Sequence, residues 1–466
     1  MVHLFQNNGF YIALDANSGT VHDLDEVAYD IIGLYESTPK DEIIKLILAK
    51  YNDRDDVTAA EIEDVLTDIE ALKKEGRLFS EDRFQAVAEK LSQRPPVIKA
   101  LCLHVAHDCN LSCGYCFAGK GEYHGDRDLM SFATGKRALD FLIEHSGDRH
   151  NLEVDFFGGE PLMNFAVVKA LTAYARSIEK QHHKNFRFTL TTNGVLIDDE
   201  VIDFCNREMS NVVLSIDGRK EVNDRFRKTR NGKGSYDLIL PKFKRLIEAR
   251  GHKDYYLRGT YTRYNTDFVR DILHLADLGF TELSMEPVIA GKGDPYALSG
   301  EDLPVLLEQY DLLGKEMNRR RKEGRPFTFY HYMIDLTHGP CIVKRVAGCG
   351  VGSEYMAVTP AGELYPCHQF VGEERFRLGN VFTGIENGKL RQEFKACNVY
   401  AHKECDACFA RFFCSGGCVA NAYHATGSLH GVYDYGCILH KKRLENAIML
   451  KVAEARDRRE KADPCE

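Results

Sequence analysis

The chain has 466 residues and 15 cysteines, and its 61 Lys and Arg against 70 Asp and Glu give a formal net charge of −9. This length and a hydrophobic share of 44% exclude a disordered or low-complexity protein and predict several folded domains. The acidic balance and the lack of a basic tail predict no nucleic-acid partner.

Residues 1–90 are expected to form a separate domain. Weak alternation over residues 10–14 and their neighbours predicts a strand pair around Asn17-Ser18-Gly19. Helical patterns follow, and residues 77–79 are expected to close the unit as a short strand. Three helices with short strands are typical of a winged-helix-like module.

The clearest helix of this unit begins with a capping box of Thr58 and Glu61 and ends at Gly76. Arg94-Pro95-Pro96 then interrupts the chain and is expected to be a linker. The apolar face of the helix comprises Ile62, Val65, Leu66, Ile69 and Leu72.

The first residues carry no secretory signal, and no run of 18 apolar residues occurs, so we expect a cytoplasmic protein with no membrane partner. Disulfides are rare in a reducing compartment. The cysteines as a set are therefore expected to bind metal or to do chemistry. Cys102, Cys205, Cys397 and Cys465 are left over: the first two are expected to be buried as small hydrophobic residues, and Cys465 to lie in an unstructured charged tail.

From residue 97 to 300, strand-like and helix-like segments alternate. Repeated units of this kind form a parallel sheet with right-handed crossovers, and six are too few to close an eight-stranded barrel. We expect an α/β fold built on a partial (β/α)6 barrel, with its functional site at the C-terminal ends of the strands. The predicted strands are residues 97–105, 152–157, 186–190, 212–216, 255–260 and 283–287.

Residues 301–438 are rich in Cys and Gly and show no even strand pattern. This segment is expected to fold around metal rather than around an apolar core. A charged helix from about Leu439 to Asp463 is predicted to end the chain, so that residues 439–466 form a C-terminal helix and tail.

A triplet of cysteines, Cys109, Cys113 and Cys116, directly follows the first predicted barrel strand. A [4Fe-4S] cluster normally has four thiolate ligands, so three leave one iron free to bind a reactant. The alternative is a structural zinc site in which His104 or His107 supplies the fourth ligand.

The triplet, with Tyr115 before its last cysteine, resembles the signature of the radical S-adenosylmethionine (SAM) superfamily. The resemblance implies that the open iron chelates SAM, whose reductive cleavage gives a 5′-deoxyadenosyl radical. Thr191-Thr192-Asn193-Gly194 resembles the turn at the end of the family's third strand, and Asn223 stands where the family usually has His. The matching positions implied to bind SAM are Gly158, Gly159 and Glu160 for its amino group, and Ser215 and Arg227 for its ribose and carboxylate.

Seven later cysteines resemble the SPASM domain, which implies two auxiliary clusters and hence three [4Fe-4S] clusters in all. Cys341 lies upstream, where it would either complete the proximal cluster or leave an iron open to a substrate thiolate. A zinc ribbon is the alternative for the pair Cys405 and Cys408. The resemblance assigns Cys349, Cys367 and Cys418 to the proximal cluster, and Cys405, Cys408, Cys414 and Cys437 to the distal one.

The N-terminal unit resembles the recognition domain of enzymes that modify ribosomally made peptides, which binds a leader peptide by strand addition. The alternatives are a dimerisation unit or a DNA-binding wing. The whole chain resembles maturases of thioether-bridged SCIFF (six cysteines in forty-five residues) peptides, at Gly348-Cys349-Gly350 and at residues 365–372. This resemblance implies a Cys-rich precursor peptide, a flavodoxin- or ferredoxin-type electron donor, and radical formation of a C–S crosslink.

Two other functions stay open. An anaerobic sulfatase-maturing enzyme shares the barrel and the SPASM domain, but that family has Asp where His368 follows Cys367. A non-enzymatic iron-sulfur scaffold that binds a peptide would gain nothing from a cluster with a vacant iron. The sequence assigns no catalytic base.

Overall fold

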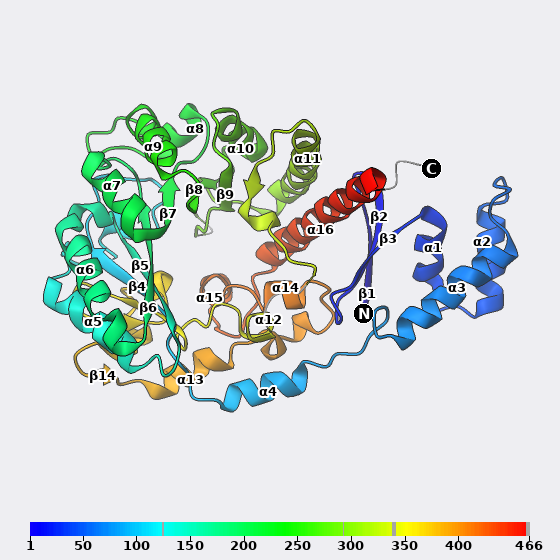
Figure 1. Cartoon of the computed structure of the whole chain (residues 1–466), viewed down its shortest axis with the longest axis horizontal. Helices are drawn as coiled ribbons and strands as arrows, with labels where there is room; N and C mark the ends of the chain where they lie inside the picture. The colour runs from blue at the N-terminus through cyan, green and yellow to red at the C-terminus, as the bar shows by residue number, and fades with distance from the viewer. Residues whose placement is uncertain (124, 292, 338–341, 463–466) are drawn as a thin grey trace.

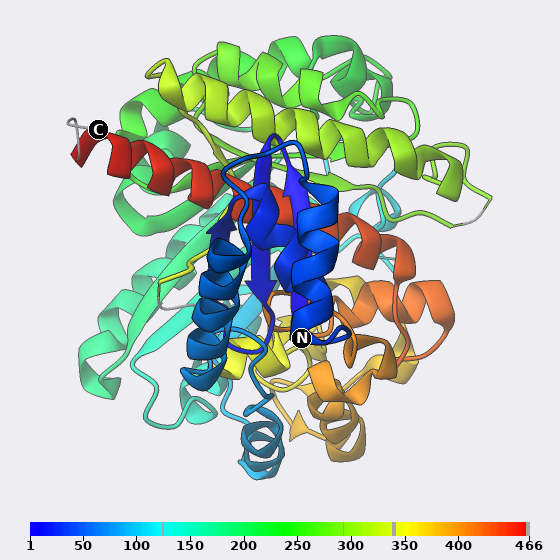
Figure 2. The same cartoon turned by 90° about the vertical axis from the view of Figure 1, so that its right-hand side faces the viewer.

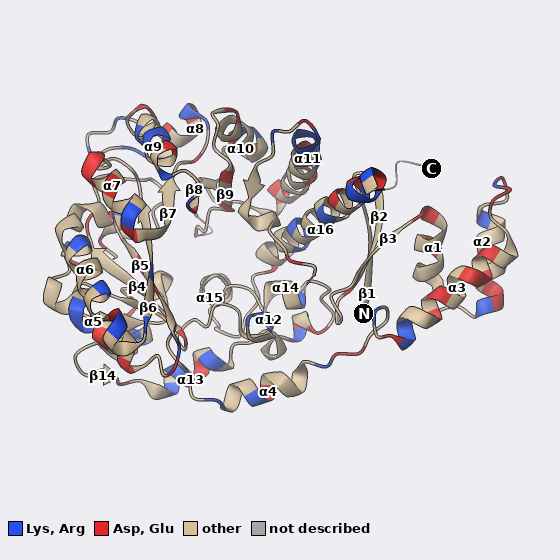
Figure 3. Cartoon of the chain, viewed as in Figure 1, with Lys and Arg blue, Asp and Glu red and all other residues tan. Residues whose placement is uncertain are grey.

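The computed structural model describes residues 1–123, 125–291, 293–337 and 342–462. Cys341 and Cys465 therefore lie outside the described residues. Within the described residues, no helix is both long and apolar enough to cross a membrane. Lys and Arg are interspersed with Asp and Glu along the helices near the C-terminus (Figure 3).

The N-terminal unit is an antiparallel sheet of order β1-β2-β3 followed by helices. The capping box of Thr58 and Glu61 is confirmed, with both reciprocal hydrogen bonds present. The predicted strand at residues 77–79 is wrong, because Phe79 has a φ of +52° and Leu78 is buried in the small core of the helices. The elements are β1 (Val2–Asn7), β2 (Phe10–Asp15), β3 (Val21–Leu24), α1 (Glu26–Leu34), α2 (Lys40–Lys50), α3 (Ala59–Lys74) and α4 (Gln85–Gln93).

The six predicted barrel strands are confirmed, and they pair in parallel and in chain order. Helices cover the outer face of this sheet (Figure 1). The strands are β4 (Ala100–Ala106), β5 (Asn151–Gly158), β6 (Asn185–Thr192), β7 (Met209–Ser215), β8 (Tyr255–Tyr261) and β9 (Glu282–Pro287). The helices are α5 (Phe132–Glu144), α6 (Phe165–His182), α7 (Asp199–Glu208), α8 (Lys220–Phe226), α9 (Tyr236–Arg250) and α10 (Phe268–Asp277).

The rest of the chain extends the barrel sheet at both edges. β10 pairs with β9, and β11 pairs in parallel with β4 and leads into β12, β13 and β14. The strands are β10 (Thr328–Phe329), β11 (Tyr355–Val358), β12 (Glu363–Tyr365), β13 (Gly379–Asn380) and β14 (Gly384–Ile385). The helices are α11 (Leu303–Lys322), α12 (Ile342–Ala347), α13 (Gly388–Ala396), α14 (Arg411–Cys414), α15 (Val419–Thr426) and α16 (Asp434–Ala462).

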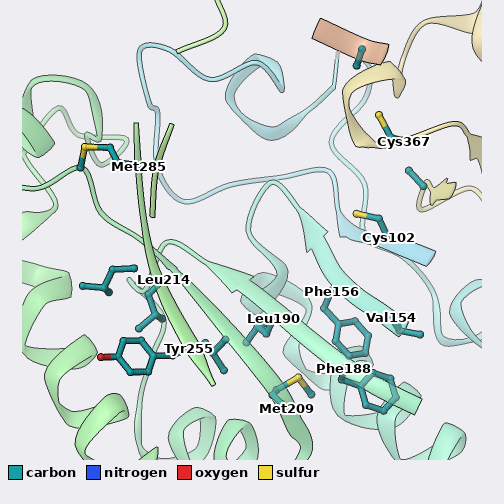
Figure 4. Packing of buried hydrophobic residues seen from close by; sticks show 14 of the residues in the cluster. Cys102, Val154, Phe156, Phe188, Leu190, Met209, Leu214, Tyr255, Met285 and Cys367 are labelled. Carbon is teal, nitrogen blue, oxygen red and sulfur yellow. The ribbon is translucent and has the colours of Figure 1, made fainter. Parts of the chain in front are cut away.

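The expectation that residues 301–438 lack an apolar core is wrong. Met356 and Val358 of β11 are fully buried, as is Phe370, and all three belong to the same hydrophobic cluster as the barrel strands. Pairing with β4 places these side chains against the barrel core, a contact that no local pattern reveals. Cys102 and Cys205 are buried in that cluster as expected, and Figure 4 shows Cys102 packed among apolar side chains.

Helix α16 connects the N-terminal sheet to the barrel. It packs against α11, and the N-terminal sheet lies across it (Figure 2). His3 Nε2 lies 3.0 Å from Glu445 Oε1, and Arg456 Nε donates to Asp23 Oδ2 at 2.7 Å. The sheet also contributes apolar residues, including Phe5, to the main cluster. The N-terminal unit is thus attached to the body of the protein through its sheet.

Substitution of Phe370 tests the apolar core of the C-terminal segment. Its ring packs against those of Phe376, tilted at 4.5 Å between centroids, and Phe394, edge-on at 5.4 Å. We expect Phe370→Ala to lower the free energy of unfolding of the metal-free protein in urea by about 3–5 kcal/mol. Phe382→Ala is the control, because that ring is 57% exposed. Equal effects of the two substitutions would contradict a packed core here.

Candidate active site

A cavity of about 460 Å³ lies at the C-terminal ends of the barrel strands. Because the six strands are parallel, these ends meet at one edge of the sheet, as in other barrels of this type. Residues of the loop after β4 line one side of the cavity, and residues of the C-terminal segment line another. The site predicted from the sequence is therefore placed where parallel-strand topology requires it.

The thiols of Cys109, Cys113 and Cys116 all line this cavity. Burial raises the pKa of Cys109 to about 12 and that of Cys113 to about 11, and the neighbouring thiols of the triplet add to both shifts. The Ser112 amide donates to the carbonyl of Lys228 at 2.7 Å and the Gly114 amide to that of Phe226 at 3.0 Å, so that the end of α8 and the residues after it hold the loop. The structure thus brings the predicted triplet together on one loop that is anchored at its centre.

The end of β5 lies directly against the cysteine loop. Gly158 has a φ of +123°, and a Cβ there would overlap the carbonyl oxygen of Ala106. A Cβ on Gly159 would overlap the backbone of Asp108. Both glycines line the cavity, and their backbones are its wall beside the thiols.

Glu160 is fully buried and does not line the cavity. Its carboxylate accepts hydrogen bonds from the amide of Leu162 at 3.0 Å, the hydroxyl of Thr192 at 2.7 Å and the amide of Asn193 at 2.8 Å. Burial raises its pKa to about 6, against the lowering effect of these donors. In the structure the carboxylate therefore joins the ends of β5 and β6, and its predicted contact with SAM stays a prediction.

Tyr115, Ser215 and Arg227 line the cavity together. The Tyr115 hydroxyl donates to Asp217 Oδ2 at 2.6 Å, and Arg227 Nη1 donates to the same hydroxyl at 3.2 Å. Arg227 Nε is buried and has no hydrogen-bond partner among the described residues. The guanidinium can therefore donate a further hydrogen bond, from Nε, to an oxygen of a ligand.

Three polar residues of the site received no role from the sequence. The carboxylate of Asp217 accepts hydrogen bonds from the Tyr115 hydroxyl and from the Thr260 amide. Its position directly after a predicted strand is the feature of the sequence that could have pointed to it. Asn193 Nδ2 lies 3.6 Å from Cys109 Sγ, and it belongs to the turn after β6. Asn223, which replaces the usual His, accepts a bond from the Asp217 amide at 3.4 Å.

The predicted proximal cysteines also meet in space. Burial raises the pKa of Cys367, and the nearby thiols of Cys418 and Cys349 raise it further. Cys418 lines the same cavity as the first triplet, together with His368 and Gln369. The cavity therefore extends from the first cysteine group to the second.

The predicted distal cysteines form a third group that lies away from the cavity. Burial raises the pKa of Cys414 to about 12, and the three other thiols of the group add to this shift. Cys405, Cys408 and Cys414 are close in the sequence, and the tertiary fold brings Cys437 of α16 to them. The group consists of Cys405, Cys408, Cys414 and Cys437.

The residues present fit SAM and iron-sulfur clusters. Thiolates are the usual ligands of such clusters, and a cluster holds them farther apart than a single ion does. Within the described part of the chain, no group of three or more His, Cys, Asp or Glu is spaced for one metal ion. The glycine wall and the free Nε of Arg227 beside the triplet offer partners for the amino and carboxylate groups of an amino acid.

Comparison with known proteins identifies two domains. Residues 103–279 match the sequence model of the radical SAM superfamily, and residues 349–409 match that of the SPASM iron-sulfur cluster-binding domain. These matches assign SAM and [4Fe-4S] clusters as the cofactors, and three clusters are consistent with a SPASM protein. The α/β fold expected from the sequence is confirmed.

Similar proteins include a cysteine-type anaerobic sulfatase-maturating enzyme of Clostridium novyi, 25% identical over 338 residues, 67% of this chain and 86% of the enzyme. The structure of anSMEcpe with bound AdoMet and Kp18Cys peptide has a TM-score of 0.62 at 20% identity and covers 77% of this chain and 100% of that one. Streptococcus suis SuiB bound to precursor peptide SuiA has a TM-score of 0.54 at 17% identity, with 94% and 100% covered. At these identities the structures show a shared fold.

Substitution of Glu160 tests its role behind the cavity wall, where it joins the ends of β5 and β6. In Glu160→Gln one carboxylate oxygen becomes an amide nitrogen, which cannot accept a hydrogen bond. The buried N–H group that donated to this oxygen then has no acceptor. The expected cost of about 1–3 kcal/mol corresponds to about five- to hundredfold faster hydrogen exchange at the amide of Asn193. Glu153→Gln, on an exposed position of the same strand, is the control. Unchanged exchange at Asn193 would rule out this role.

Proposed function

We propose that this protein is a radical SAM enzyme that forms an intramolecular thioether bond in a Cys-rich precursor peptide. One observation carries the proposal: a single cavity is lined by the first cysteine triplet and by Cys418 of the second group. A peptide that enters it can place a carbon near the first group and a cysteine sulfur near the second. The reducing cytoplasm and a flavodoxin- or ferredoxin-type electron donor suit this chemistry.

The residues that would hold the cofactors follow from the cysteine groups. When bound, SAM and its cluster supply a 5′-deoxyadenosyl radical that removes a hydrogen atom from carbon. Cys109, Cys113 and Cys116 would hold that cluster, Arg227 would pair with the SAM carboxylate, and Ser215 would contact its ribose. The backbone of Gly158 and Gly159 would accept hydrogen bonds from the SAM ammonium group. Only glycine leaves room for the backbone to come close to the ligand at these positions.

The overall reaction balances. One C–H bond and one S–H bond of the peptide break, and one C–S bond forms. The carbon-bound hydrogen ends in 5′-deoxyadenosine, the thiol hydrogen leaves as a proton, and SAM is converted to methionine. SAM cleavage consumes one electron and formation of the C–S bond releases one electron, so the overall reaction needs no net electron supply. The peptide therefore loses two hydrogens for each crosslink.

The N-terminal unit would recognise the leader of the peptide. Among the described strands, β3 pairs only with β2, so one edge of the sheet is available for an added strand. Asp15 donates its amide to Thr20, which places the amides of Val21 and Asp23 on the side of β3 away from β2. Two backbone donors of β3 thus face outward, as strand addition requires.

Anaerobic sulfatase maturation is the second candidate, favoured by the similarity to the Clostridium novyi enzyme. The residue after Cys367 argues against it, because His368 stands where that family has Asp. Burial lowers the pKa of His368 to about 4, so the imidazole is neutral near pH 7. A mere peptide-binding scaffold is disfavoured, because the first cysteine group has three thiols and the cavity lies beside them.

SAM cleavage tests the role of the first triplet. We expect Cys113→Ala to reduce anaerobic formation of 5′-deoxyadenosine with dithionite to background, because the cluster loses a ligand. The assay is chromatography of the nucleoside. Cys205→Ala is the control, since this thiol is buried in the barrel core outside all three groups. Cleavage by the Cys113 variant at the control's rate would rule out the assignment.

The peptide reaction tests the proposed product. The substrate for this test is a leader-bearing Cys-rich precursor peptide, to be sought as a short reading frame beside the gene, and mass spectrometry should show a loss of two hydrogens for each crosslink. Val21→Pro removes an outward amide of β3 and is expected to lower this modification about tenfold, the effect of one lost hydrogen bond. Val21→Thr keeps the amide and is the control. Conversion of cysteine to an aldehyde instead would support the sulfatase-maturing alternative.

A further inference from the structure

Arg258 is a cationic side chain on the interior face of the barrel, and it has no role in the site described above. Arg258 lies on β8, opposite Ser215 of β7 on one side and Ser284 of β9 on the other. Alternation along β8 places it on the same face as Thr260, and both residues line the cavity. Arg258 is exposed to the cavity, whereas its neighbours on the strand, Leu257 and Gly259, are buried.

The guanidinium of Arg258 has no hydrogen bond or ion pair within 4.0 Å among the described residues. The nearest carboxylate that lines the cavity belongs to Glu286, which faces Thr260 across the strands. Glu286 Oε1 lies 3.2 Å from His331 Nε2, and its Oε2 lies 3.5 Å from Arg443 Nη1. The one acidic residue on the cavity wall is therefore already bonded to His331 and Arg443. Arg258 attracts Glu286 only from a longer distance and makes no hydrogen bond or ion pair of its own among the described residues.

The cavity wall as a whole carries excess positive charge. Its charged side chains are Lys120, Arg227, Arg258 and Glu286. Arg227 has a place in the site already, because it bonds to the Tyr115 hydroxyl and has a free Nε near the triplet. A second arginine on an interior strand face, with five donors and no hydrogen-bond partner in the described part of the chain, is suited to a carboxylate held in two hydrogen bonds.

We propose that Arg258 is a specificity residue that binds a carboxylate of the peptide substrate. This inference rests on the proposed function only in taking a peptide as the occupant of the cavity. The carboxylate belongs either to an Asp or Glu side chain beside the reacting cysteine or to the C-terminus of the peptide. Because Arg258 lies beside Ser215, this contact holds the reacting segment next to the SAM-binding side of the cavity.

Labelled synthetic peptides test this assignment. Each consists of Gly and Ser around one Cys; one pair has Asp or Asn beside the Cys, and a second pair has a free or an amidated C-terminus. Their affinities for the SAM-bound holoenzyme are measured by fluorescence anisotropy. A charged hydrogen bond predicts about ten- to hundredfold tighter binding of one carboxylate peptide than of its neutral counterpart. The pair that shows the difference identifies the source of the carboxylate.

Two variants decide the role of the side chain. Arg258→Gln is expected to reduce the affinity ratio of the discriminating pair to about one. Arg270→Gln is the control, because this arginine is exposed on α10 and pairs with Asp267 outside the cavity. A residue with a merely structural role would lower both affinities and leave their ratio unchanged, which would overturn the proposal.

The remaining outcomes are also decisive. Equal affinities in the wild-type protein, or no binding up to about 1 mM peptide, would overturn the proposal. Weaker SAM binding in Arg258→Gln with an unchanged peptide ratio would assign the residue to the SAM carboxylate instead. The affinity for carboxylate peptides could depend on Arg258 while no peptide ever loses two hydrogens. This result would support the carboxylate site and contradict thioether formation.

Discussion

The close approach of β5 to the loop after β4 is the contact on which the rest of the site depends. Gly158 and Gly159 allow the backbone of one strand end to touch the backbone that carries the first cysteine triplet. Glu160 then ties this strand end to the end of β6 through two buried hydrogen bonds, from the Thr192 hydroxyl and the Asn193 amide, and a third from Leu162 holds its carboxylate in place. The thiols, the glycine wall and the turn after β6 are thereby held as one rigid edge, around which the cavity forms.

The continuous sheet places the second cysteine group at the same cavity. Since β11 pairs with β4, the segment that carries Cys367 is built onto the barrel rather than attached by a flexible linker. Cys418 and His368 therefore face the first triplet across a space lined by both domains. A peptide in this space would meet both kinds of thiol group, which is the physical basis for a reaction that joins carbon to sulfur.

Helix α16 links distant parts of the molecule. One of its residues, Glu445, contacts His3 of the N-terminal sheet, and another, Arg443, lies 3.5 Å from Glu286 on the cavity wall. These two residues are neighbours in the sequence but face different partners. The sheet proposed to bind a leader and the cavity proposed to hold the reacting segment are thus connected through a single helix.

The sequence by itself determined the six parallel strands, the cysteine groups and the place of the site, because alternating β/α units and cysteine spacing are local patterns. Tertiary structure alone decided that Glu160 is buried behind the cavity wall, that residues 301–438 share the barrel core, and that Arg258 faces the cavity with no hydrogen bond or ion pair to another described residue. Each of these depends on which segments distant in sequence pack together, and burial or pairing of a charge is a property of that packing.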